Sequence, residues 1–249
     1  MRSGGARRAI TAAAACGSLL IAMAACGGPQ TGVPLRDVPG PGGPTGALLP
    51  RSIAEPAHVP GVGERLWQNV PASARQVVAV YGDGDDSPDS TLVLYEKHGS
   101  QWQQAGSWAA HNGKRGWTTD HHEGDERSPV GVFSLSDAGG YLENPGALLP
   151  YTQDEDAFVT PYSGDDAHLH DFDYVIAVNY NRVPGTRPDD KSRPQGQSKG
   201  GGIWLHLDHG DGTLGCVSVP ESAMEYLLRT LNPKSKPVVV MGDRADLKA

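Results

Sequence analysis

The segment GGIWLHLDHGDGTLGCVSV, residues 201–219, decides the fold more than any other part of the chain. Its apolar run 203–207 predicts a buried strand that carries His206. After a short Gly-rich loop the chain resumes at Cys216, and the run 216–219 predicts a second strand. A loop this short keeps the two strands close. We therefore expect His206 and Cys216 to face each other across adjacent strands.

A cysteine beside a histidine is typical of nucleophilic catalysis. The thiolate attacks a carbonyl, and the imidazole acts as the base. Gly215 has no side chain, so it allows close approach of a substrate and unusual backbone angles. The N–H groups of Gly215 and Cys216 are candidate donors to an oxyanion. Two alternatives stay open: His209 as the base, and Cys216 as an inert core residue.

The rest of the chain predicts a mainly β domain with one or two helices. Gly (33) and Pro (20) are abundant, which is typical of a turn-rich fold rather than a helical bundle. The run 220–231 predicts a helix, with Pro near its start and an apolar stripe at helical spacing. β-Branched and apolar runs predict strands at 76–81, 91–95, 101–105, 130–135, 174–180 and 237–242.

The N-terminal region reads as a targeting signal followed by a tether. Residues 1–25 combine three Arg with an uncharged, Ala-rich stretch, as in a signal peptide. The sequence Met-Ala-Ala-Cys at 23–26 resembles a bacterial lipobox, with Met where Leu is usual, so we expect Cys26 to be lipidated. The alternatives are an ordinary signal peptide and an uncleaved anchor. Residues 26–65 are predicted to be a flexible linker, and 66–249 the folded domain.

Charge and cysteine content exclude one class of function and favour another. The chain has 21 Lys and Arg against 29 Asp and Glu, a net charge of −8, so it lacks the basic surface of a nucleic-acid-binding protein. Cleavage before Cys26 removes three Arg and Cys16, leaving 21 − 3 = 18 basic residues and a net charge of −11. With Cys26 lipidated, Cys216 has no disulfide partner. An unpaired thiol in an exported chain indicates a reactive role.

Four segments in order resemble the L,D-transpeptidase catalytic (YkuD) family, over roughly residues 75–242. The first is Arg127-Ser128-Pro129 followed by Val-Gly-Val-Phe, and the second is the predicted strand from Asp173 through Asn179 and Asn181. The others are the strand ending at His206 and the run Thr-Leu-Gly-Cys-Val at 213–217. The chain is most similar to a divergent branch with Thr-x-Gly-Cys-Val, because Leu214 stands where most members have a second His.

The resemblance implies a β-sandwich in which Cys216 is the nucleophile, His206 is the base and the Leu207 carbonyl orients His206. It implies an enzyme that forms peptidoglycan cross-links through a thioester with stem peptides, without metal or cofactor. We expect Thr213 either to support the nucleophile or to shape the turn. For Asn179, hydrogen bonding to a stem and turn formation remain alternatives. The predicted location is the outer face of the bacterial cytoplasmic membrane, as a lipid-anchored monomer.

Three alternatives to this function remain. Water in place of an acceptor amine gives an L,D-carboxypeptidase. Leu214 favours a wall-binding lipoprotein without turnover, and Asp208 or Asp211 would complete the triad of another thiol hydrolase. A metal site is not expected, because His206 and His209, three residues apart on a strand, face opposite sides, and no His-Glu-x-x-His motif is present. The His pairs at 121–122 and 168–170, with Asp171, are expected to be solvated loop residues.

Overall fold

The computed structural model describes residues 58–160 and 166–249. The predicted signal peptide, Cys26 and most of the predicted linker lie outside these residues. None of the helices in the described residues combines the length and apolar character that a membrane crossing requires.

Nine strands form one sheet with the order β11-β1-β2-β3-β10-β9-β8-β6-β7. β11 also pairs with β6, so the sheet closes on itself. Of the described strands of this sheet, only β7 lies outside the closed part. A separate parallel pair, β4 with β5, lies beside it. The strands are β1 (Gln76–Gly82), β2 (Asp89–His98), β3 (Gln101–His111), β4 (Trp117–Thr118), β5 (Ser128–Pro129), β6 (Gly131–Gly140), β7 (Tyr151–Gln153), β8 (Val175–Val178), β9 (Trp204–Leu207), β10 (Val217–Val219) and β11 (Val238–Asp243).

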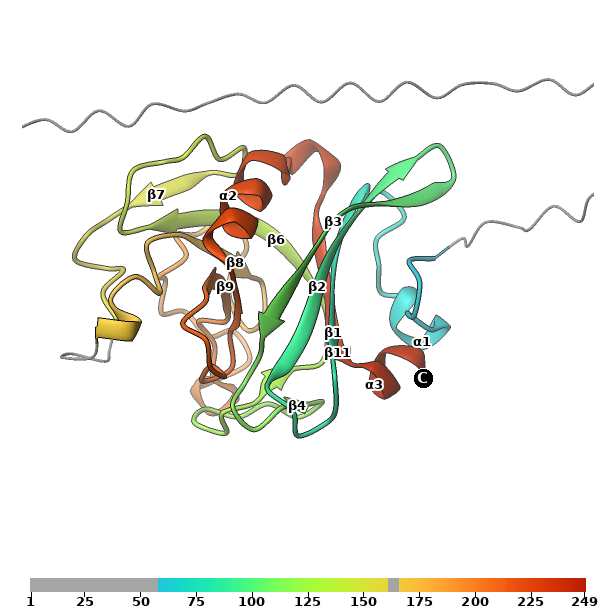
Figure 1. Ribbon diagram of the computed structural model, residues 1–249, viewed down its shortest axis with the longest axis horizontal. Coiled ribbons are helices and arrows are strands. Elements are labelled where there is room, and N and C mark those ends of the chain that lie inside the picture. The colour runs from blue at the N-terminus through green and yellow to red at the C-terminus, as the bar shows by residue number, and fades with distance from the viewer. Residues whose placement is uncertain (1–57, 161–165) are drawn as a thin grey trace, which may run out of the picture. The chain divides into compact units, whose positions relative to one another are not determined.

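The inner faces of the closed sheet share one apolar core. Side chains of β1, β2, β8, β9, β10 and β11 meet there, as the inner faces of a sandwich do. Helix α2 (Glu221–Thr230) packs against β9 (Figure 1) and adds Met224, Leu227 and Leu228 to this core. The core therefore supports the inner faces of β9 and β10, the strand that carries His206 and the strand that directly follows Cys216.

A second apolar cluster covers the outer face of β1, β2 and β11. The short helices α1 (Glu64–Trp67) and α3 (Arg244–Lys248) take part in it through Leu66 and Leu247. Val59 and Val62 are also buried there, so residues 58–65, assigned to the linker by composition, pack onto the domain. Because both faces of β1 and β11 are covered, these strands are apolar without alternation.

The predicted mainly β class is confirmed, and every predicted strand is present. β3 runs to His111 and β6 to Gly140, well beyond their predicted ends, because their later residues are small or polar. Residues 58–160 and 166–249 contain three α-helices rather than the predicted one or two, since α1 and α3 are too short to show a helical stripe. Three 3₁₀ turns complete the described elements: Asp166–His168, Gln197–Lys199 and Pro233–Ser235.

Candidate active site

β9 and β10 run parallel and bring the predicted nucleophile and base to one face. Ser218 is paired with His206 in the register, and Cys216 immediately precedes β10. Side chains two residues apart on a strand share a face, so Cys216 lies on the same side as His206. The backbone N–H of Trp204 donates to the Sγ of Cys216 at 3.4 Å. The two strands are thus hydrogen-bonded neighbours, as the short loop predicts.

The tautomer of His206 is fixed by its own chain. Its Nδ1 lies 2.8 Å from the carbonyl oxygen of Leu207. A carbonyl only accepts, so Nδ1 carries the hydrogen and Nε2 holds the lone pair. The ring is buried between Phe172, edge-on at a centroid distance of 5.4 Å, and His209, stacked at 6.0 Å. His206 therefore presents a base at Nε2 and has little freedom to rotate.

Burial keeps both reacting groups neutral at rest. Burial lowers the pKa of His206 to about 4, although the Leu207 carbonyl and Asp171 oppose the shift. Burial also raises the pKa of the Cys216 thiol to about 11, with the Trp204 N–H opposing and the Asp171 charge adding to the rise. Near pH 7 the site holds a thiol and a neutral imidazole.

Two hydroxyls fix the loop that carries Cys216. Thr213 Oγ1 donates to the Cys216 carbonyl at 2.7 Å and accepts from the N–H of Gly215 at 3.1 Å. Ser128 Oγ lies 2.8 Å from the Gly215 carbonyl and 3.0 Å from the Cys216 carbonyl, and it accepts from the Gly113 N–H at 2.9 Å. Since the Gly215 N–H already has a partner, the Cys216 N–H is the better candidate for an oxyanion donor.

Cys216 opens onto a cavity of about 650 Å³. Its wall includes two cations, Lys191 and Arg193, and one carboxylate, Glu123. Leu214, where a second His was expected from the main branch of the family, is 50% exposed and does not line this cavity. The other lining residues are Ala157, Val159, Phe172, Gln197, Gly201, Gly202 and Trp204.

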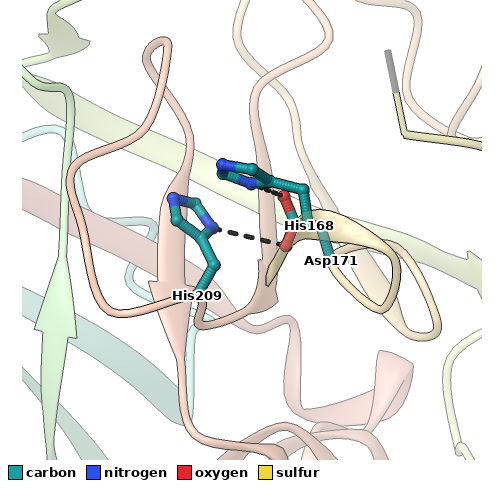
Figure 2. Close-up of side chains that lie close together, drawn as sticks. All are labelled: His168, Asp171 and His209. Carbon is teal, nitrogen blue, oxygen red and sulfur yellow. Dashed lines mark hydrogen bonds and ion pairs between the residues drawn. The ribbon is translucent and has the colours of Figure 1, made fainter. Parts of the chain in front are cut away.

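A buried carboxylate joins two histidines next to His206. Figure 2 shows Asp171 between His168 and His209, with Nδ1 to carboxylate distances of 2.9 Å and 3.4 Å. Burial raises the pKa of Asp171, but the hydrogen bonds of His209 and His168 outweigh it, and the net pKa is lowered. The expectation for His168 and Asp171 as solvated loop residues is therefore wrong. His209 lies on the same side as His206, not opposite, because β9 ends at Leu207 and the chain turns.

The same three residues form one of two described groups that could hold a metal ion. Their ligand atoms lie within 4.8 Å of one another, and the other group is Asp85, Asp243 and Asp246. In the His168–Asp171–His209 group the carboxylate faces both imidazoles: it is hydrogen-bonded to His168 and forms an ion pair with His209, whose buried Nδ1 has no hydrogen-bond partner of good geometry among the described residues.

The structure places other predicted residues away from the cavity. Asn179 donates to Ser134 Oγ at 2.8 Å and Ser136 Oγ at 2.9 Å, and it accepts from Arg182. It supports a loop instead of lining the site. Of the two predicted triad carboxylates, Asp208 accepts from Ser218 Oγ and lies 2.7 Å from His111 Nδ1, whereas Asp211 accepts from the N–H of Gly212. The carboxylate that influences His206 most is Asp171.

Sequence reasoning also missed His121 as a structural residue of the site. It is buried, its Nδ1 lies 3.0 Å from Asp125, and its ring packs edge-on against Tyr180. A Cβ on Gly215 would lie 3.4 Å from its Cε1, and one on Gly200 3.0 Å from its Nε2. His121 thus packs against Gly200 and Gly215, which precede the cavity-lining residues Gly201 and Cys216, and the expectation that His121 is a solvated loop residue is wrong. No local signal distinguishes it from the exposed His122.

The comparisons with known proteins agree with the motifs. The model of the YkuD family, described as the L,D-transpeptidase catalytic domain, matches residues 85–240. No curated protein matches the chain. Among solved structures, that of Bdellovibrio bacteriovorus Bd1075 is similar with 18% identity and a TM-score of 0.38, over 68% of this chain and 48% of that one. The chain therefore spans about half the length of that protein's solved chain.

Proposed function

The chain belongs to the L,D-transpeptidase catalytic domain (YkuD) family, and from this premise we propose that it forms peptidoglycan cross-links through a thioester on Cys216. One observation carries the proposal: Cys216 opens onto the cavity, on the strand face that holds His206 in a single tautomer. A nucleophile in a cavity beside an oriented base is the minimum arrangement for acyl transfer.

In the first half-reaction, the Cys216 sulfur attacks the carbonyl carbon of a diamino-acid residue in a tetrapeptide stem. His206 Nε2 takes the thiol proton during the attack, because the resting thiol is neutral. The Cys216 N–H donates to the developing oxyanion. The tetrahedral intermediate then collapses, the C–N bond breaks, and the imidazolium protonates the departing amine of the terminal D-residue. A thioester remains on Cys216.

In the second half-reaction, an amine from another stem attacks the thioester carbonyl. His206 takes a proton from that amine, the C–S bond breaks, and the proton returns to sulfur. The buried negative charge of Asp171 stabilises the imidazolium that exists in both halves. Residues 1–57 lie outside the structural description. For them we propose export, lipidation of Cys26 and attachment to the outer face of the cytoplasmic membrane.

Intact-mass spectrometry of residues 58–249 with a tetrapeptide stem tests the proposal. The expected result is a mass increase equal to the stem without its terminal residue, on the peptide that contains Cys216. Cys216→Ser provides the matched control, because it keeps the shape of the side chain and removes the thiol. An unmodified Cys216 after incubation, while an active transpeptidase of the same family turns over in parallel, would rule the proposal out.

A binding protein without turnover is the second candidate, and the raised pKa of Cys216 favours it. A neutral, half-buried thiol is a weak nucleophile until substrate or a rearrangement assists it. This alternative predicts that Cys216→Ser binds a stem peptide as tightly as the native protein, which itself never acylates. The fate of the thioester separates transpeptidation from hydrolysis: a cross-linked product identifies the first, and a free tripeptide stem the second.

A further inference from the structure

Arg193 lies on the wall of the Cys216 cavity without a carboxylate partner among the described residues. Its Nη1 donates to the carbonyls of Asp190 and Ser192, each at 2.9 Å. These bonds engage Nη1 and leave Nε and Nη2 without a hydrogen bond among the described residues. The side chain is half-buried, whereas Arg187 in the same loop is paired with Asp154 and Asp189. The pKa of Asp190 is lowered, first by its hydrogen bonds from Ser192 and also by the charges of Arg182 and Arg193. The hydrogen-bond partners of Arg193 are neutral carbonyls, however, and a half-buried guanidinium of this kind next to a nucleophile is suited to an anion.

Glycines make room for this side chain. A Cβ on Gly201 would lie 2.3 Å from Arg193 Nε, and one on Gly202 would lie 3.5 Å from its Nη2. Both residues have positive φ, +148° and +70°, which glycine adopts without strain. The guanidinium therefore lies close to the backbone that leads into β9. The Gly202 carbonyl also accepts from the Cys216 thiol at 3.5 Å, so one short segment contacts both the arginine and the nucleophile.

The local charge is opposite to that of the whole chain. The chain has a net charge of −8, yet the cavity wall carries Lys191 and Arg193 against Glu123. The nearest carboxylate in sequence, Asp190, accepts from the backbone N–H of Ser192 at 2.8 Å. An acidic protein with a cationic patch beside its nucleophile favours an anionic ligand at that place and repels anions elsewhere.

We propose that Arg193, seated against Gly201 and Gly202, binds a free carboxylate of the molecule that reacts with Cys216. The identity of that molecule as a peptidoglycan stem rests on the proposed function, whereas the anion subsite does not. Two free carboxylates of a tetrapeptide stem flank the carbonyl that is attacked, one on the terminal D-residue and one on the side chain of the diamino acid. Binding either one positions the carbonyl between them against the sulfur.

Alkylation of Cys216 tests the subsite without any peptidoglycan. Iodoacetate and iodoacetamide have nearly the same shape, but only iodoacetate is an anion. With each, an S–C bond forms, iodide leaves and the thiol proton is lost to solvent. The measured quantity is the rate constant for iodoacetate divided by the rate constant for iodoacetamide. This ratio is then normalised by the same ratio for N-acetylcysteine amide. Because the iodoacetamide rate reports access to the thiol, the ratio isolates charge.

The expected normalised ratio for the native protein is at least threefold, and Arg193→Gln lowers it by about three- to tenfold. Arg193→Lys retains most of the effect, because it keeps the charge. Arg187→Gln, which removes the same charge from the same loop outside the cavity, leaves the ratio unchanged. A ratio that Arg193→Gln does not alter overturns the proposal, and an elevated ratio that only Lys191→Gln lowers assigns the subsite to Lys191.

Acylation by synthetic stems then locates the carboxylate. Three tetrapeptides are compared: one with both carboxylates free, one amidated at the terminal residue and one amidated on the diamino-acid side chain. Arg193→Gln is expected to lower kcat/KM for acylation about 10- to 100-fold with the free stem, and to have no effect with one of the amides. An equal loss with all three stems overturns the assignment to either of the two carboxylates that flank the attacked carbonyl. If the native protein acylates with none, the proposed function fails, while the alkylation ratio still decides the anion subsite.

Discussion

Ser128→Ala should destabilise the domain by about 2–4 kcal/mol, a large effect for the loss of one hydroxyl. Ser128 Oγ is fully buried and joins three segments: it accepts from Gly113 N–H and donates toward the Gly215 and Cys216 carbonyls. Removing it leaves a buried N–H without a partner, at about 1–3 kcal/mol, and removes a hydrogen bond worth about 0.5–1.5 kcal/mol. For a domain of this size, the melting temperature should fall by roughly 4–16 °C.

Calorimetry at neutral pH measures this loss, and Ser107→Ala is the matched control. Ser107 lies exposed on β3, so the same chemical change there should alter the free energy of unfolding by less than about 0.5 kcal/mol. Because Ser128 holds the carbonyl of Cys216 itself, the iodoacetamide rate of Cys216 should also change in Ser128→Ala and not in Ser107→Ala. Equal melting temperatures for the two variants would refute the role assigned to Ser128.

Three further predictions follow from the charges and glycines of the site. The rate of acylation should fall as the pH falls through about 4, where His206 becomes protonated. The rate of iodoacetamide alkylation should keep rising toward a pH of about 11, where the Cys216 thiol ionises. A plateau of the alkylation rate near neutral pH would contradict a resting state in which Cys216 and His206 are both neutral. The pKa of His209 is raised, first by its hydrogen bond to Asp171. Its stabilisation is therefore complete below the unfolded value of about 6.5 and is lost as the pH rises through the folded pKa. His206 has a lowered pKa and is therefore neutral in both states above about pH 6.5. Asp171→Asn should therefore flatten the fall in melting temperature that occurs as the pH rises above about 6.5, and an unchanged slope would count against the pairing of His209 with Asp171. Gly201→Ala should cost about 1–3 kcal/mol more than Gly210→Ala in urea unfolding, since both have positive φ but only Gly201 faces a clash at 2.3 Å; equal costs would show that Arg193 moves aside freely.

The local sequence pattern was enough to predict the strands that are buried on both faces and those in which apolar and polar residues alternate. β1 and β11 are continuous apolar runs because two clusters cover them, and such runs are readable from sequence. The later half of β3 was missed because Gly, Ser and Ala predominate there and only Trp108 is a large apolar residue. Closure of the sheet through β11 and β6 was not predictable, since register between distant strands leaves no local trace.

The site divides in the same way. Cys216 and His206 could be predicted as candidates from sequence because they lie within one short segment with a recognisable motif. Ser128 contacts residues about 88 positions away, and Asp171 reaches His209 across a separate loop, so neither role can be read from neighbours in sequence. In the sequence, Arg193 is indistinguishable from other cations in loops. Its proposed role depends on the cavity and on the contacts with Gly201 and Gly202, which only the structure shows. Roles that depend on absence of a partner are the hardest to predict.

The pairing of β1 with β11 bears on how the protein acquires its structure. Val77 pairs with Val238, 238 − 77 = 161 residues later, so the sheet cannot close until nearly the whole domain has emerged. Folds dominated by such distant contacts assemble slowly, over milliseconds to seconds. Until β11 arrives, β1 and β6 each have an open edge that can pair with other chains. Truncation before residue 238 should therefore yield an aggregating chain, and a holdase that covers those edges should raise the yield of the full-length protein.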